Sequence, residues 1–182
     1  MKFTHAFRFL IVLSLAFYVY GCSSRPTDMI QKTEQARTEA MSEYAEQFAP
    51  DDWSAAEKSW QDASAKLDAN SNSEAYTLLL KAKGGYDKAH SLAKGRRESA
   101  IKEITGIQGT ATIRLKELTN HPDVKKLSAA RKKEFDNVVQ RLGDNIAQVS
   151  TQMQNGQYNE AKLLVGRTLR EIWENQQEFF KK

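Results

Sequence analysis

The chain has few of the residues from which reactive sites are built. Its 182 residues include a single cysteine, Cys22, which excludes an internal disulfide and any metal site made of several cysteines. Beyond the first 21 residues only His90 and His121 remain, and neither has a Cys, Asp or Glu at the spacing of a metal site or a catalytic triad. We therefore expect no catalytic residues, no metal and no cofactor, and we predict that the protein is not an enzyme.

Proline is also scarce, and Pro26, Pro50 and Pro122 each stand at an expected helix boundary. Residues 73–119 carry small and apolar side chains mostly at steps of three and four, the period of one helical face. These positions are Ala75, Leu79, Ala82, Tyr86, Ala89, Ala93, Ala100, Ile104, Ile107, Ala111, Leu115 and Leu118. Other helices must cover such a stripe, so we predict an all-α fold. We expect an elongated antiparallel helical bundle, or stacked helical hairpins, organised around a long central helix at about 73–119.

Shorter helices are predicted at 28–48, 50–69, 123–153 and from 158 onward. Gly84 and Gly85 leave open whether the long helix is continuous or kinked, because a glycine costs roughly 1 kcal/mol relative to alanine in a helix. We expect the glycines of this helix to permit close helix packing. The aromatic residues are expected mainly in the core, with the last two as an alternative exposed docking spot. They are Trp53, Trp60, Tyr86, Phe135, Trp173, Phe179 and Phe180.

A weak internal repeat appears at an offset of 86 residues and aligns, for example, Ala56 with Leu142 and Leu79 with Val165. Two copies of one helical hairpin would explain it, although two unrelated amphipathic hairpins could be aligned in the same way. We expect residues 28–182 to form a single helical domain. The repeat would divide it into two related hairpins at about 50–100 and 123–182.

The first 21 residues have the pattern of an export signal. Lys2 and Arg8 supply positive charge, and the twelve residues from Phe9 to Tyr20 form an apolar run interrupted only by Ser14. This run is too short for a transmembrane helix, which needs about 20 residues, but it suits the apolar region of a signal peptide.

The run ends in Val19, Tyr20, Gly21 and Cys22, which resembles the lipobox of bacterial lipoproteins. The resemblance implies signal cleavage between Gly21 and Cys22, a diacylglycerol on the Cys22 sulfur, and acylation of the new amino group by a fatty acid such as palmitate. Residues 22–27 would then be a lipidated tether. The absence of an aspartate after Cys22 resembles the sorting signal for the outer membrane, facing the periplasm. An uncleaved anchor, or an ordinary signal peptide with an incidental cysteine, is the alternative.

The run Phe48, Ala49, Pro50 before Trp53 resembles a broad, functionally undefined family of helical envelope lipoproteins. The turn and helix start at 156–161 look similar to those of tetratricopeptide-like hairpins, although the full 34-residue repeat is absent. The resemblance implies an envelope location and a hairpin architecture, and it implies no activity.

Charge is unevenly distributed along the chain. Residues 22–80 hold 5 basic and 11 acidic side chains, whereas residues 81–133 hold 14 basic and 5 acidic ones. Either these charges offset each other within the fold, or the basic part binds an anionic partner such as an envelope polymer, a lipid surface or an acidic protein. We expect no nucleic acid partner. The candidate partner contacts are Lys94, Arg96, Arg97, Lys125, Lys126, Arg131, Lys132 and Lys133.

The sequence thus favours a lipid-anchored cell-envelope protein that acts as a periplasm-facing structural or protein-interaction module. A second hypothesis is a carrier or chaperone for an apolar ligand, bound in a groove between helices. That groove would be lined by Leu78, Leu79, Ile104, Ile107 and Leu164. A third is an envelope tether joined to peptidoglycan through Lys182, an arrangement similar to that of the murein lipoproteins.

Overall fold

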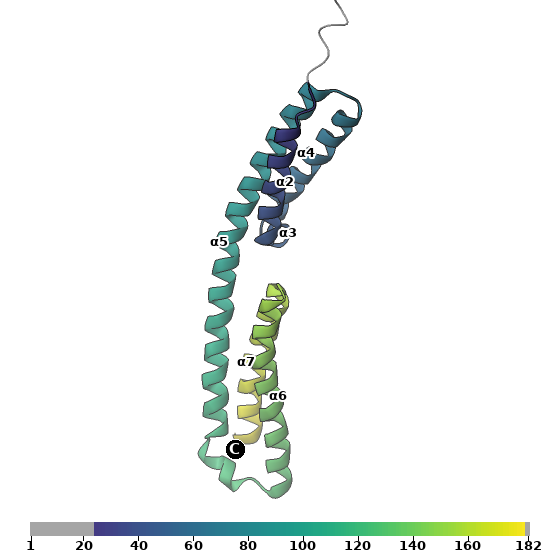
Figure 1. Cartoon of the computed structure of the whole chain (residues 1–182). Helices are drawn as coiled ribbons and strands as arrows, with labels where there is room; N and C mark the ends of the chain where they lie inside the picture. Colours follow the sequence, from purple (N-terminus) through teal and green to yellow (C-terminus); the bar gives the residue numbers. More distant parts are fainter. Residues whose placement is uncertain (1–23, 181–182) are drawn as a thin grey trace, which may run out of the picture. The chain divides into compact units, whose positions relative to one another are not determined.

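The computed structural model describes residues 24–180, and within this range it contains helices and no strand (Figure 1). The all-α prediction is therefore confirmed. The predictions for Gly21, Cys22 and Lys182 lie outside the described residues. The helices, in chain order, are α2 (Thr27–Ser42), α3 (Ala45–Phe48), α4 (Pro50–Asp68), α5 (Asn72–Thr119), the 3-10 helix η1 (Pro122–Lys126), α6 (Ala129–Gln154) and α7 (Tyr158–Phe180).

The long helix α5 has 48 residues and runs through Gly84 and Gly85 without interruption. Its bounds confirm the prediction from the apolar stripe to within one residue. Nine of the twelve stripe positions are buried, and the other three, Ala100, Ile107 and Leu115, are partly exposed. The stripe therefore forms the face of α5 that packs against other helices.

The chain divides into two compact units between Lys94 and Gly95, a point that lies within α5. In the first unit, α2, α3 and α4 pack beside the first part of α5 (Figure 1). The Thr33 hydroxyl of α2 contacts the Leu79 carbonyl of α5 at 3.3 Å. The core of this unit consists mostly of alanines: Ala36, Ala40, Ala45, Ala49, Ala56, Ala82, Tyr86, Ala89 and Ala93. Small side chains allow these helix backbones to lie close together.

Gly85 shows how close α4 and α5 lie. A Cβ atom added at Gly85 would lie 2.8 Å from the Ala56 Cβ, whereas one added at Gly84, Gly95, Gly106 or Gly109 would meet no atom within 4 Å. The expectation that glycines permit close packing is thus confirmed at Gly85. It is wrong at the other four, because a Cβ at those positions would contact no atom of a neighbouring helix within 4 Å.

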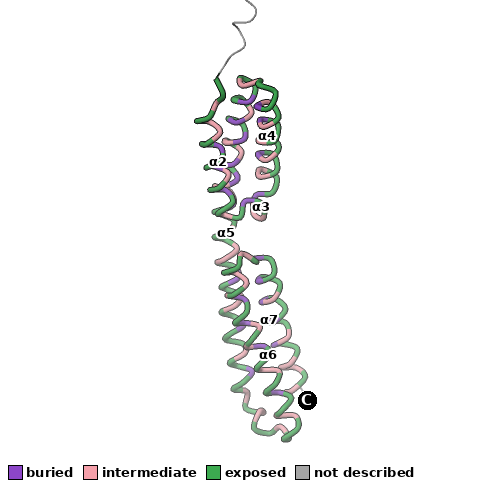
Figure 2. The backbone as a smooth tube through the Cα atoms, turned by 45° about the vertical axis from the view of Figure 1, so that its right-hand side comes forward, coloured by how far each residue is buried: buried purple, intermediate pink, exposed green. Residues whose placement is uncertain are grey.

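In the second unit, α6 and α7 form a hairpin beside the second part of α5 (Figure 2). The Gln108 side chain of α5 donates hydrogen bonds to the Ile146 carbonyl at 2.8 Å and to the Ser150 hydroxyl at 3.0 Å, both on α6. Buried side chains are larger than in the first unit. They include Ile104, Leu118, Phe135, Leu142, Val149 and Val165.

The turns that close the hairpins α4–α5 and α6–α7 have the same backbone hydrogen bonds. The Ser71 amide donates to the Lys66 carbonyl at 2.8 Å, and the Gln157 amide donates to the Gln152 carbonyl at 2.9 Å. The residue before each donor, Asn70 or Gly156, has a positive φ, of 57° and 76° respectively. This is the helix-ending motif that asparagine and glycine favour. The two turns lie 86 residues apart. Whether the hairpins are related copies stays a prediction.

Two predicted helices are interrupted. The helix expected at 28–48 breaks at Tyr44, whose backbone is left-handed with φ 58° and ψ 44°. In the last turn of α2 the Ser42 hydroxyl donates to the Glu39 carbonyl at 2.7 Å. The helix expected from 123 begins instead at Ala129, since Pro122 starts the separate 3-10 helix and the Ser128 hydroxyl accepts from the Arg131 amide.

The aromatic residues divide between core and surface. Tyr86 and Phe135 are fully buried, as expected. Phe179 and Phe180 pack on Phe135, with ring centroids 5.2 and 5.7 Å away. The Phe180 ring also stacks on His121 at 4.1 Å, so these two residues are part of the packing and not a separate docking spot. The core prediction is wrong for Trp173, which is 60% exposed.

Candidate functional site

The predicted basic contacts lie at two places in the chain. Lys94, Arg96 and Arg97 lie in the middle of α5, and the remaining five lie on η1 and the first two turns of α6. Several of the second group have acidic neighbours within the same unit. Lys126 pairs with Asp123 at 2.6 Å, Lys132 pairs with Asp136, and Arg131 pairs with Glu134 and Glu178.

Arg131 is held further by an aromatic ring, since its guanidinium lies 4.3 Å from the centroid of Phe179. Lys125 and Lys133 are exposed, and no carboxylate of residues 24–180 lies within ion-pair distance of either. Much of the basic charge at this end is therefore offset inside the unit.

Basic charge is also offset in the first unit, where ion pairs join α4 and α5. Lys88 of α5 lies 2.6 Å from Asp52 of α4, and Lys66 of α4 lies 2.5 Å from Glu74 of α5. Of the two alternatives for the uneven charge, offset within the fold therefore applies to these residues of α4 and α5.

The five residues expected to line an apolar groove do not share one hollow. Leu79 and Ile104 are fully buried, so a ligand cannot reach them. Leu78 lines a hollow of the first unit with Ala65 and Thr77, and Ile107 lines a hollow of the second unit with Gly106 and Leu169.

A groove runs between α5 and α7 in the second unit, and of the five residues expected from the sequence Ile107 lines it. Two adjoining hollows of about 530 and 420 Å³ share Thr110 and Leu169. The exposed indole of Trp173 lines the second hollow together with Arg114 and Ile172. The available sequence signal was the run of small residues Ser99, Gly106 and Thr110, which lie at helical spacing beside the buried stripe and leave the floor of the groove open.

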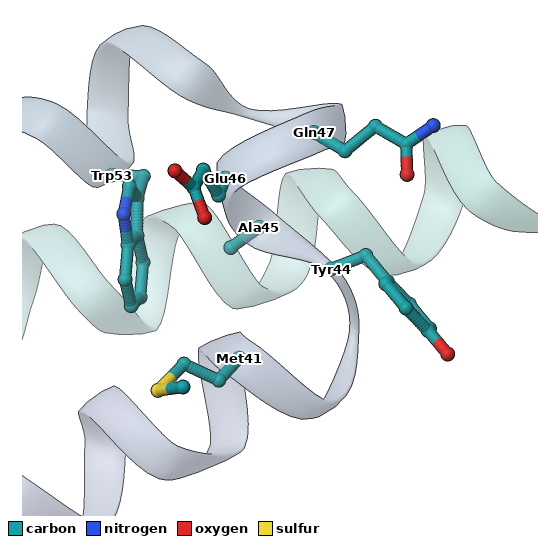
Figure 3. Close-up of a pocket in the computed structure, with 6 residues that line it drawn as sticks. All are labelled: Met41, Tyr44, Ala45, Glu46, Gln47 and Trp53. Atoms are coloured by element: carbon teal, nitrogen blue, oxygen red, sulfur yellow. The ribbon is translucent and has the colours of Figure 1, made fainter. Parts of the chain in front are cut away.

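A smaller pocket of about 310 Å³ lies at the break between α2 and α3 (Figure 3). The left-handed backbone of Tyr44 turns the chain here, so that the end of α2, the short helix α3 and the first turn of α4 meet. In Figure 3 the Glu46 carboxylate is turned toward the indole of Trp53, and Tyr44 and Gln47 extend to the other side. The lining residues are Met41, Tyr44, Ala45, Glu46, Gln47 and Trp53.

A partly buried hydrogen-bond network of Arg37, Glu57 and Tyr86 lies beside the indole of Trp53. The Arg37 guanidinium lies 5.7 Å from the indole centroid, and the Tyr86 ring lies 5.4 Å from it. Arg37 and the Tyr86 hydroxyl both donate to the Glu57 carboxylate, at 2.5 and 2.8 Å. Burial, followed by the hydrogen bond to Glu57 and its charge, raises the pKa of Tyr86 well above its ordinary value. The Trp53 wall of the pocket is therefore packed against the side chains of Arg37 and Tyr86.

The chain segment that lines this pocket is acidic. From Thr38 to Glu57 the chain has six acidic side chains and no lysine or arginine. Asp52 and Glu57 are paired with Lys88 and Arg37 of other segments. Glu46 is exposed, and no basic side chain in the described part of the chain lies within ion-pair distance of it.

Three comparisons with known proteins give no relative, since no family model, no curated protein and no solved structure matches the chain. Among residues 24–180 no group of three or more His, Cys, Asp or Glu side chains is placed to hold a metal ion. No helix in the same range combines the length and apolar character needed to cross a bilayer. In the described residues the fold defines an all-α helical protein, and its hollows include the groove between α5 and α7 and the small pocket beside Trp53.

Proposed function

We propose that this protein is a lipid-anchored component of the bacterial cell envelope, and that its helical body binds a partner protein in the periplasm. The observation that carries the proposal is the lone Cys22 directly after an apolar run of signal-peptide length. Three acyl chains on residue 22 would give effectively permanent anchoring, because one chain alone binds a membrane only marginally. The absence of aspartate after Cys22 favours the outer membrane.

Exposed apolar side chains support a binding role. Trp173 is 60% exposed and Ile113 is also 60% exposed, and Trp173 lines the groove between α5 and α7. Tryptophan is enriched among the residues that contribute most to protein interfaces. The offset of much basic charge within each unit makes an anionic polymer a weaker partner than a protein. The proposal includes no catalysis.

The anchor is tested by replacing Cys22 with serine in cells. We expect the Cys22→Ser chain to keep its signal peptide, to lose incorporation of labelled palmitate, and to lose its lipid-dependent association with the outer membrane. Gly21 would stay joined to residue 22. A variant with unchanged mass, palmitate labelling and fractionation would disprove the anchoring proposal.

The binding role is tested by photo-crosslinking in living cells. A crosslinking amino acid at Trp173 or at Thr110, which line the same hollow, should capture one and the same envelope protein. The control position is the exposed Glu160 near the start of α7, which should not capture it. Equal capture of bulk proteins from all three positions would contradict a specific interface.

A further inference from the structure

The pocket at the break between α2 and α3 combines features that suit a positively charged side chain. Its walls include the thioether of Met41 and the indole of Trp53, and the Glu46 carboxylate is turned toward that indole (Figure 3). An indole face attracts cations, and the most frequent protein cation in such contacts is the arginine guanidinium. A carboxylate beside the ring adds a hydrogen-bond acceptor of opposite charge.

The protein already uses this combination once. Arg37 lies near the same indole and donates two hydrogen bonds, at 2.5 and 3.3 Å, to the Glu57 carboxylate. Arg37 does not line the pocket, and Glu46 has no basic neighbour at ion-pair distance in the described chain. The pocket therefore repeats the aromatic ring and the carboxylate of that arrangement, but without its guanidinium.

Size and charge identify the occupant further. A volume of about 310 Å³ is at the lower end of small-molecule sites, so it suits one side chain better than a whole ligand. Of the six acidic residues from Thr38 to Glu57, Asp52 and Glu57 already pair with basic side chains of this chain. The exposed Glu46 has no such pair among the described residues, so its charge attracts a basic side chain to the pocket.

The backbone at the pocket is also conformationally strained. Tyr44 has φ 58°, a region that a bulky residue other than glycine rarely adopts. Such outliers persist where the surroundings impose them, and they occur preferentially at functional sites. Here the left-handed turn brings Glu46 toward Trp53.

We propose that this pocket binds an arginine side chain of the partner protein, with the guanidinium against Trp53 and hydrogen-bonded to Glu46. The inference rests on the proposed binding role and specifies the chemistry of the partner. The groove between α5 and α7 is left out of the inference, because nothing in the structure shows what covers it.

The test is a titration of the purified full chain in detergent, followed by NMR at the Met41 methyl group and the Trp53 indole N–H. The probe is N-acetyl-arginine methylamide, and the matched control is N-acetyl-citrulline methylamide, which has nearly the same shape without the charge. We expect saturable shifts at both groups with the arginine probe. Binding of the citrulline probe should be weaker by roughly fivefold, the factor of an exposed ion pair.

Two variants separate this site from general charge attraction. Glu46→Gln should weaken binding of the arginine probe to the level of the citrulline probe. Glu34→Gln, at an exposed position of α2, should leave binding unchanged. Equal binding of both probes, the absence of a saturable shift, or full binding by Glu46→Gln would overturn the inference. None of these results depends on the lipid anchor or on the crosslinking, so the two proposals fail separately.

Discussion

At the scale of single residues, Tyr86 links the core of the first unit to its polar network. Its ring is fully buried, and its hydroxyl donates to Glu57 at 2.8 Å, where Arg37 also binds. Burial and the Glu57 carboxylate raise the pKa of the phenol above its ordinary value of 10.0, because both oppose the formation of a phenolate. The same contacts that fix Trp53 therefore make the stability of this unit depend on pH.

The sign of this dependence follows from proton binding. Above pH 10 the unfolded chain loses the Tyr86 proton while the folded protein retains it, so the free energy of unfolding falls as the pH rises. Below pH 10 this contribution is fully present. Tyr86→Phe should cost about 1.5–3 kcal/mol at neutral pH for the lost hydrogen bond to a charged group. The difference between the two proteins should shrink as the pH increases above 10.

Chemical denaturation from pH 7 to pH 11 would measure both effects. Lysines titrate in both proteins, so only the difference between them reports on Tyr86. Tyr76→Phe, at an exposed position of the same helix, serves as a control and should change stability at neutral pH by less than about 0.5 kcal/mol. A difference that stays constant up to pH 11 would show that the phenol ionises alike in both states.

At the scale of elements, packing decides which predictions from the sequence succeed. The apolar stripe located α5 to within one residue, because burial on one helical face needs a period that only a helix supplies. The break at Tyr44 could not be predicted, since a tyrosine has no preference for a left-handed backbone. At the break the end of α2, the short helix α3 and the first turn of α4 meet, and no glycine, asparagine or proline at positions 42–46 marks it in the sequence.

Packing also decides which residues of the candidate sites could be predicted from the sequence. Composition could locate the basic residues, and their pairs with Asp123, Glu134 and Asp136 follow from helical spacing of three or four residues. The pair of Arg131 with Glu178 joins positions 47 residues apart, so only the packing of α6 against α7 shows it. Trp173 lies on an apolar helix face by its spacing, and only the packing of α7 shows that it is 60% exposed. The pocket beside Trp53 depends on the break at Tyr44, so it could not be predicted from the sequence either.

Two adjacent glycines of α5 allow a matched test of packing between elements. Gly84→Ala adds a methyl group with no atom within 4 Å, so it should stabilise the protein by about 1 kcal/mol through helix propensity. Gly85→Ala places a methyl group 2.8 Å from the Ala56 Cβ and 3.3 Å from its Cα. Overpacking typically costs about 1–3 kcal/mol, which should exceed the gain in propensity.

Thermal and urea unfolding of both variants would check the pair. The midpoint should rise for Gly84→Ala and fall for Gly85→Ala, although the two changes are chemically identical. A rise in both would mean that α4 moves aside without cost. The double variant Gly85→Ala with Ala56→Gly should recover stability if the two methyl groups are the cause of the loss.

At the scale of the whole molecule, the chain divides between Lys94 and Gly95, within the helix α5. This raises the question whether the two units open separately or together. Each unit has its own buried residues, and each takes a different part of α5 into its core. If stability is local to each unit, a cavity in one core should not loosen the other. If α5 couples them, both should open together.

Two identical substitutions distinguish these cases. Leu79 in the first unit and Leu142 in the second are both fully buried, and Leu→Ala at such sites costs about 2–5 kcal/mol. We expect Leu79→Ala to accelerate hydrogen exchange in residues 27–94 and Leu142→Ala to accelerate it in residues 95–180, by at least about tenfold. Exchange measured by mass spectrometry on the full chain resolves both regions. The amides of α5 provide the decisive measurement. Their exchange should be accelerated on only one side of Lys94 in each variant. Uniform acceleration of exchange along the chain in either variant would instead establish a single cooperative unit. A partner bound to one unit would then also stabilise the other unit.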